Sequence, residues 1–102
     1  MTPEHRVMNE IRIWCGQHNL LCFRCNVGKI KLPNGGYFDT GLPNGFPDLL
    51  ILGNNGDIYF CEVKAPGGRQ RPDQIKFQYM VESRGFKYIL AYSIKEVENG
   101  IL

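Results

Sequence analysis

The sequence predicts a single α/β domain in which helices pack on a mixed β-sheet. Three observations predict it: a helical apolar stripe near the N-terminus, two strand-like runs around a turn in the middle, and a helix followed by a strand toward the C-terminus. The 102 residues hold one compact core, so we expect one domain over residues 1–102. A hydrophobic share of 43% and a charged share of 22% exclude a disordered or collagen-like chain.

The first element is an amphipathic helix from Pro3 to about Gln17. Thr2 is placed to cap it, and Pro3 occupies the first helical position. Its apolar residues follow the i, i+3, i+4, i+7 pattern of one helix face: Val7, Met8, Ile11, Trp14 and Cys15. We therefore expect Trp14 in the core rather than stacked on a ligand.

Short extended segments follow the helix. Leu20–Cys25 is a strand candidate, and Lys29–Leu32 and Tyr37–Phe38 are extended pieces around a turn at 33–36. The Gly- and Pro-rich stretch 41–47 is a loop.

A hairpin comes next, with strands Asp48–Leu52 and Ile58–Lys64 joined by a turn at 53–57. After a polar loop, Pro72 begins a helix that runs to about Arg84.

The last part of the chain begins at Gly85, which is placed to end that helix. Lys87–Tyr92 is a final strand, and Ser93 with Glu96 is the capping box of a last short helix.

The strand Ile58–Lys64 has the most unusual pattern. Its side chains alternate between two faces that are both apolar at the start, which predicts a central, buried strand. Glu62 and Lys64 then fall on one face at its end, where burying a charge is costly. Such a pair is often functional, and the alternative is a plain ion pair at the rim of the sheet.

Asp48 strengthens the functional interpretation. If the turn holds an odd number of residues, antiparallel pairing sets Asp48 opposite Glu62, with β-carbons about 4.5–5.5 Å apart. Two carboxylates this close repel each other unless a cation lies between them. Their oxygens suit Mg²⁺ or Mn²⁺, and Lys64 would stabilise charge on a reacting phosphate or position the attacking water. An even-numbered turn would put Asp48 on the other face.

These residues resemble a known family. Gly45-Phe46-Pro47-Asp48, followed 14 positions later by Glu62-Val63-Lys64, is similar to the PD-(D/E)XK nuclease motif. The flanking residues resemble the VRR-NUC branch of that superfamily, and the likeness runs from about Glu4 to Tyr92. The segments that carry the second likeness are Arg24-Cys25-Asn26-Val27-Gly28, Ala65-Pro66-Gly67-Gly68-Arg69, Pro72-Asp73-Gln74 and the helix that contains Trp14.

The resemblance implies a restriction-endonuclease-like core of element order αβββαβ, and metal-dependent hydrolysis of phosphodiester bonds. By this likeness Asp48 and Glu62 bind the metal and Lys64 is the catalytic lysine. Gln74 matches a glutamine that members of the family place beside the site.

The resemblance also implies a third acid on the first helix. At about 100° per residue, Glu4 lies about 20° from the centre of the apolar stripe and Glu10 roughly 100° away. Glu4 therefore faces the sheet, and its place ten residues before Trp14 matches the family pattern. We expect Glu4 to be the third acid and Glu10 to lie on the surface.

Arg71 departs from the family pattern, because related sequences often have a Ser or Thr there that caps the second helix. We expect the side-chain cap to be lost and a cation near substrate phosphates to be gained; the alternative is a solvated arginine.

The formal charge of +2 does not by itself demand a polyanionic partner, but its distribution is uneven. Leu20–Phe38 holds three cations and no anion, and Lys64–Lys76 holds four cations and one anion. We expect these segments to contact phosphates, with ordinary solvated loops as the alternative. The expected nucleic-acid contacts are Arg24 and Asn26, which the resemblance suggests, and Lys29, Lys31, Arg69, Arg71 and Lys76.

The cysteines are Cys15, Cys22, Cys25 and Cys61. No secretory signal precedes them, so we expect reduced thiols and a cytoplasmic chain without a membrane segment. The spacing of Cys22 and Cys25 suits zinc, but no second pair of ligands accompanies it. A zinc-stabilised interaction domain remains an alternative.

A domain of this size without a recognition helix favours binding by DNA shape over binding by sequence. The resemblance to stand-alone members, many from phages and bacteria, implies a homodimeric Holliday-junction resolvase that needs no small-molecule cofactor. We therefore expect four-way junctions to be preferred over flaps. The rival from another class is a nucleic-acid-binding module that keeps the fold but does not cut.

Overall fold

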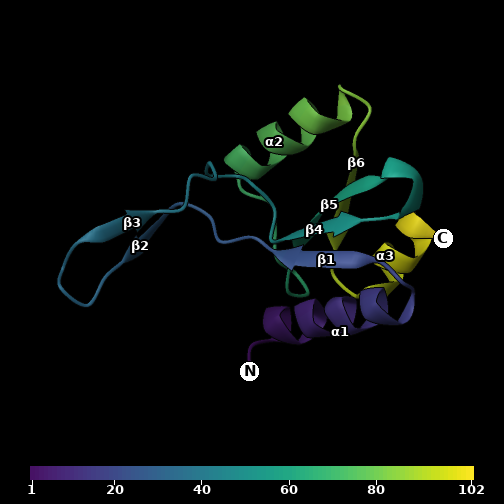
Figure 1. The fold of residues 1–102 in the computed structure, drawn as a ribbon, viewed down its shortest axis with the longest axis horizontal. Helices are drawn as coiled ribbons and strands as arrows, with labels where there is room; N and C mark the ends of the chain where they lie inside the picture. Colours follow the sequence, from purple (N-terminus) through teal and green to yellow (C-terminus); the bar gives the residue numbers. More distant parts are fainter.

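The computed structural model describes all of residues 1–102 and centres on a four-stranded mixed sheet with helices on both faces (Figure 1). The strands are β1 (Leu21–Arg24), β4 (Leu49–Leu52), β5 (Ile58–Val63) and β6 (Lys87–Ala91), in the order β1-β4-β5-β6. β1, β4 and β5 are antiparallel, whereas β5 and β6 are parallel. The predicted α/β class, mixed sheet and central place of β5 are confirmed.

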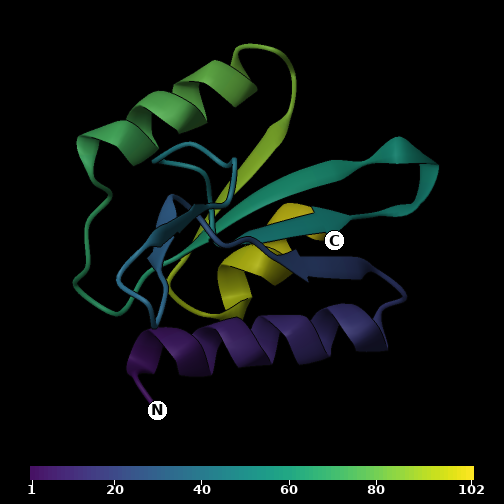
Figure 2. The ribbon, with the colours of Figure 1, turned by 60° about the vertical axis from the view of Figure 1, so that its left-hand side comes forward.

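One face of the sheet is covered by α1 (Pro3–Gln17) and α3 (Ile94–Ile101), which lie on the same side of it in both views (Figure 2). The Thr2 hydroxyl caps α1 by accepting a hydrogen bond from the backbone N–H of His5 at 3.1 Å. The predicted apolar stripe of α1 packs into the main core, with Trp14 buried. The buried residues of this core are Met8, Ile11, Trp14, Cys15, Leu49, Ile51, Tyr59, Cys61, Val63, Ile89, Ala91 and Val97.

The opposite face is covered by α2 (Pro72–Glu82), which crosses from β5 to β6. Phe60 of β5 meets Phe46 and Phe77 edge-on, with ring centroids 5.9 and 5.5 Å apart, and Phe86 closes the group at 6.0 Å. Such T-shaped pairs add to the burial energy of the rings. This aromatic cluster holds α2, β5 and the loop before β4 together.

The turn between β4 and β5 has the odd length on which the register prediction depends. Residues 53–57 connect the strands, with a short 3₁₀ turn (η1, Asn54–Gly56) in the middle, and Asn55 adopts a positive φ of 63°. The ladder pairs Leu52 with Ile58 and Leu49 with Cys61. The side chains of β4 and β5 therefore point to the faces of the sheet that the sequence predicted.

A separate two-stranded hairpin stands apart from the main sheet. It consists of β2 (Lys29–Lys31) and β3 (Tyr37–Asp39), and it projects from the body to one side (Figure 1). The sequence predicted both strands and the turn, but it did not predict that they leave the sheet.

The helix ends differ slightly from prediction. α2 ends at Glu82 rather than near Arg84, because residues 83–85 form a C-terminal turn in which Gly85 has φ 86°. Ser93 and Glu96 form the predicted capping box of α3. No helix is both long enough and apolar enough to cross a membrane.

Candidate active site

Asp48 and Glu62 lie opposite each other where β4 and β5 meet. The ladder that pairs Leu49 with Cys61 extends by one step to this pair. The next backbone N–H of β5, that of Val63, donates to Asp48 Oδ2 at 2.8 Å rather than to a backbone carbonyl. The Asp48 carboxylate is thereby fixed over the end of β5.

The loop before Asp48 is held against the first turn of α2. Gly45 has a φ of 92°, and a Cβ there would collide with the backbone carbonyl of Asp73. Only glycine allows this approach without a shift of one segment. The next residue, Phe46, is anchored in the aromatic cluster 5.1 Å from Phe77. The sequence predicted a loop here but not this contact with α2.

Glu62 is the most buried charged residue of the chain, with 2% of its surface exposed. Its Oε2 atom accepts a hydrogen bond from Gln74 Nε2 at 2.7 Å and lies 3.5 Å from Lys64 Nζ. Its Oε1 atom is buried and has no hydrogen-bond partner. A buried carboxylate with one unsatisfied oxygen is costly unless a cation completes its surroundings.

The oxygen and the nitrogen of the Gln74 side-chain amide each make one hydrogen bond that orients it. Its Oε1 accepts from the backbone N–H of Arg71 at 2.9 Å, which leaves Nε2 directed at Glu62. The loss of a side-chain cap at Arg71 is confirmed, because Gln74 rather than Arg71 satisfies the helix end. The Arg71 guanidinium instead pairs with Asp73 at 3.3 Å, which partly neutralises the predicted cation.

The charge balance at Glu62 favours a bound cation. Burial, together with the nearby Asp48, raises the pKa of Glu62 to about 7, although Lys64 opposes this shift. Two facing carboxylates with an orphaned buried oxygen form a hard, oxygen-only donor set, which is the type that Mg²⁺ and Mn²⁺ prefer. The residues present therefore fit a divalent cation.

Glu4 is not brought into this pair. It lies half-buried in the first turn of α1, and α1 packs on the face of the sheet opposite to α2. The structure contains no group of three or more His, Cys, Asp or Glu side chains that could hold a metal. The role of Glu4 as a third acid stays a prediction.

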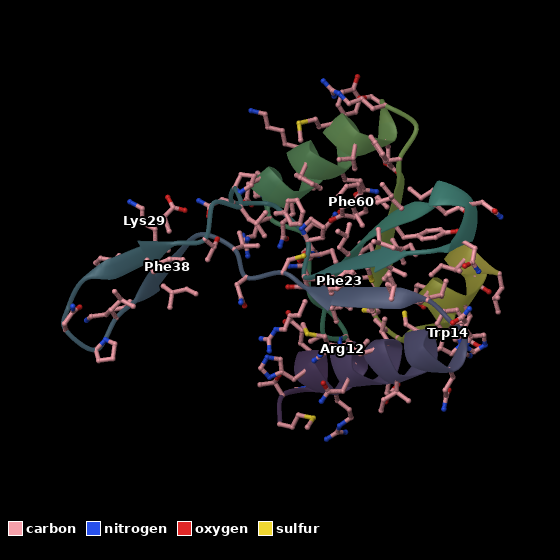
Figure 3. The ribbon with its side chains drawn as sticks, in the orientation of Figure 1. Arg12, Trp14, Phe23, Lys29, Phe38 and Phe60 are labelled. Carbon is pink, nitrogen blue, oxygen red and sulfur yellow. The ribbon has the colours of Figure 1, made fainter.

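The predicted DNA-contacting residues are spread around the site. Arg24 ends β1 opposite Leu49, the residue after Asp48, and Asn26 lies in the loop that follows. Lys29 and Lys31 lie on the projecting hairpin, as Figure 3 shows for Lys29. Arg69 and Arg71 lie on the loop that leads into α2, and Lys76 lies on α2 itself; all these residues are exposed.

Sequence reasoning missed the residues that hold the loop between Lys64 and α2. The Tyr92 hydroxyl donates to the carbonyl of Gly68 at 2.9 Å, which ties this loop to the end of β6. Gln70 Nε2 donates to Gln78 Oε1 at 2.9 Å and to the Tyr88 hydroxyl at 3.3 Å. Only isolated polar residues in an apolar strand, Tyr88 and Tyr92, could have signalled these contacts.

A surface hollow lies elsewhere, between α1 and β1, where Arg12 and Phe23 contribute to its lining (Figure 3). It holds no acidic residue, so it cannot be the hydrolytic centre. Asp48 and Glu62 lie outside this hollow, at the end of the ladder between β4 and β5.

The sequence profile of the VRR-NUC domain matches residues 2–95. The chain belongs to the VRR-NUC family. A solved structure titled VRR_NUC domain is similar to it, with 24% sequence identity over 97% of this chain and 94% of that chain, and a TM-score of 0.73. A comparison with curated proteins gives no match. The VRR-NUC domain is a nuclease-type module that processes DNA, and this chain carries that module over nearly its whole length.

Proposed function

We propose that this VRR-NUC chain is a metal-dependent, structure-specific DNA endonuclease that acts on branched DNA, with four-way junctions as its preferred substrate. One observation carries the proposal. The buried Glu62 has a carboxylate oxygen, Oε1, without a hydrogen-bond partner; its carboxylate faces Asp48 and is contacted by both Lys64 and Gln74. A buried cluster of charged groups that lacks some of its hydrogen-bond partners, at the end of a central strand, is typical of a catalytic site.

Asp48 and Glu62 would hold the cation, which we expect to be Mg²⁺ or Mn²⁺. When bound, such an ion polarises the scissile phosphate and lowers the pKa of a water molecule. The backbone N–H of Val63 holds the Asp48 carboxylate, and the Gln74 amide holds that of Glu62. Both acids are thus oriented before any ligand arrives, which reduces the cost of ordering them.

Lys64 would act on the reacting phosphate. Its side chain is 13% exposed, so it is accessible enough to meet a phosphate and dry enough to interact strongly with one. We expect it to leave Glu62 for the phosphate oxygens, where it stabilises the extra negative charge that develops as water attacks phosphorus. One P–O bond forms, another breaks, and the products are a phosphate end and a hydroxyl end.

Two arguments favour branched DNA as the substrate: the exposed cations on the surface of the protein and the symmetry of the expected cuts. The exposed cations around the site can contact phosphates on several strands, whereas no element is shaped to read bases in a groove. Two-fold symmetrical cuts in a junction call for two sites, so we propose a homodimer. The outer side of α2 exposes Ile75, Tyr79 and Met80, which is where a second copy could pack.

The test is cleavage of end-labelled four-way junction, 5′ flap and plain duplex with Mg²⁺ or Mn²⁺. Lys64→Ala is compared with wild type, and Lys95→Ala, an exposed lysine on α3, is the matched control. We expect paired symmetrical cuts in the junction, a loss of about a hundredfold or more in Lys64→Ala, and none in Lys95→Ala. Light scattering at the assay concentration reports the expected dimer.

The other outcomes point to the alternatives. Cutting of the flap alone would keep the site and change the substrate. Tight junction binding with no cutting of any DNA would make the chain a binding module, and the 3.5 Å pair between Lys64 and Glu62 would then be structural.

A further inference from the structure

The β2–β3 hairpin has one apolar face and one polar face. The pairing of Ile30 with Phe38 places these two side chains on the same face, and Leu32 follows at the next position of that face. They are 44%, 57% and 38% exposed, respectively. Figure 3 shows Phe38 on the hairpin, well away from the body of the molecule.

The other face of the hairpin is polar and mainly basic. Lys31 pairs with Tyr37, and Lys29 pairs with Asp39, the acid that ends β3. A two-stranded hairpin is marginally stable by itself, and an exposed apolar face of this kind is usually covered by a partner. Because cations lie behind the apolar face, the partner that fits both faces is an anionic one.

The base of the hairpin is tied to the candidate active site. The backbone N–H of Cys25, at the entry to the hairpin, donates to the Asp48 carbonyl at 2.8 Å. At the exit, the N–H of Thr40 donates to the Gly28 carbonyl at 3.0 Å, which joins the two legs. The segment that leads into the hairpin therefore starts from the backbone of Asp48.

These features favour DNA over a second copy as the occupant of the apolar face. The hairpin is continuous with Asp48, and no acidic residue lies between Leu20 and Phe38. A two-stranded ribbon fits a DNA groove, and Phe, Leu and Ile are the side chains that wedge between base steps.

We infer that Ile30, Leu32 and Phe38 form a wedge that stacks on the base pairs exposed at a DNA branch point, while Lys29 and Lys31 contact the flanking phosphates. This inference rests on the proposed function and names the feature of the substrate that would be recognised. In intact duplex a base step must first be unstacked before a side chain can enter, so the wedge would favour branched over linear DNA.

Phe38 and Tyr37 provide a matched pair for the test, because they are adjacent, exposed aromatic residues on opposite faces. Binding is measured in EDTA, where cutting is absent, with a four-way junction that carries 2-aminopurine at the branch point and with plain duplex. The proteins are wild type, Phe38→Ala, Tyr37→Ala and Phe38→Trp, which restores a stacking ring. Thermal melts and sedimentation check the fold and the oligomeric state of each.

We expect Phe38→Ala to weaken junction binding about tenfold, to leave duplex binding nearly unchanged, and to abolish the change in 2-aminopurine emission. Tyr37→Ala and Phe38→Trp should keep the preference for the junction. Junction binding by Phe38→Ala equal to that of wild type would overturn the wedge. Conversion of a wild-type dimer to a monomer by Phe38→Ala would also overturn it, because the apolar face would then join two copies.

Cleavage separates this inference from the proposed function. If wild type cuts junctions and Phe38→Ala keeps full preference for them, the wedge fails and the endonuclease stands. If wild type cuts nothing but Phe38→Ala loses its junction preference, the endonuclease fails and the wedge stands.

Discussion

Gln74 joins the start of α2 to the candidate metal ligand Glu62 through a single amide. Its removal leaves the N–H of Arg71 without its partner and the Oε2 of Glu62 with Lys64 alone. We expect Gln74→Ala to lower the cleavage rate about tenfold or more, since partners that orient metal ligands have effects of this size. Gln78→Ala is the control, because Gln78 lies one turn further along and bonds Gln70 instead. Equal rates for the two variants would contradict the role of Gln74.

Gly45 and Gly16 differ in the space that a side chain would have. A Cβ at Gly45 would meet the Asp73 carbonyl, whereas a Cβ at Gly16 meets nothing within 4 Å. We expect Gly45→Ala to lower both the melting temperature and the cleavage rate, because α2 and its Gln74 must shift. Gly16→Ala should stabilise the fold by about 0.5–1 kcal/mol through its better helix propensity. Melting curves and cleavage rates of both variants check this.

The capping box of α3 predicts that the stability of the fold depends on pH through Glu96. Partial burial alone would raise the pKa of Glu96, but hydrogen bonds from the Ser93 hydroxyl and the N–H groups of Tyr92 and Ser93 outweigh it and lower this pKa below 4.5. A lowered pKa in the folded state adds stability above the unfolded value, and this stability is lost as the pH falls through the folded value.

Glu96→Gln should therefore melt below wild type at pH 7, and the difference should shrink as the pH falls below about 4.5. Ser93→Ala removes the other half of the box and should cost about 1 kcal/mol. Thermal melts from pH 7 to pH 3 provide the measurement. A constant difference between Glu96→Gln and wild type over this range would contradict the assignment.

The elements were predictable because each has a local signal. Thr2-Pro3 begins α1, the alternation in β5 marks a central strand, and the Ser93 and Glu96 spacing caps α3. The departure of the β2–β3 hairpin from the sheet was not predictable, since strands of three residues look the same whether they extend a sheet or leave it. The end of α2 was placed two residues too far, because Ser83 and Arg84 continue the helical pattern into the terminal turn.

Removal of metal tests the site at the scale of the whole molecule. A catalytic cation bound by Asp48 and Glu62 should raise the melting temperature in Mg²⁺, while the metal-free protein stays folded in EDTA because its core is apolar. Asp48→Asn should lose the Mg²⁺-dependent rise, and Asp57→Asn, an exposed acid in the turn, should keep it. Unfolding by EDTA would instead favour a zinc-stabilised domain that uses Cys22 and Cys25.

The pairing of Asp48 with Glu62 was the part of the site that sequence reasoning could reach, because it follows from turn length and strand alternation. The contact of Gln74 with Glu62 was implied by resemblance alone, since it depends on how α2 docks on the sheet. The close approach of Gly45 to Asp73 was out of reach, because packing of a loop against the first turn of a helix leaves no periodic trace in the sequence. The helical angle of Glu4 gives the direction of its side chain, and its role as a third acid stays a prediction.

The parallel pairing of β5 with β6 has a consequence for how the chain is made. The candidate site lies within residues 48–74, but the partner of β5 on its other side is β6, the last strand to leave the ribosome. Until then this buried, mostly apolar strand has an open edge that can pair with another nascent chain. A chain interrupted after α2 would hold every residue of the site and still be prone to aggregate.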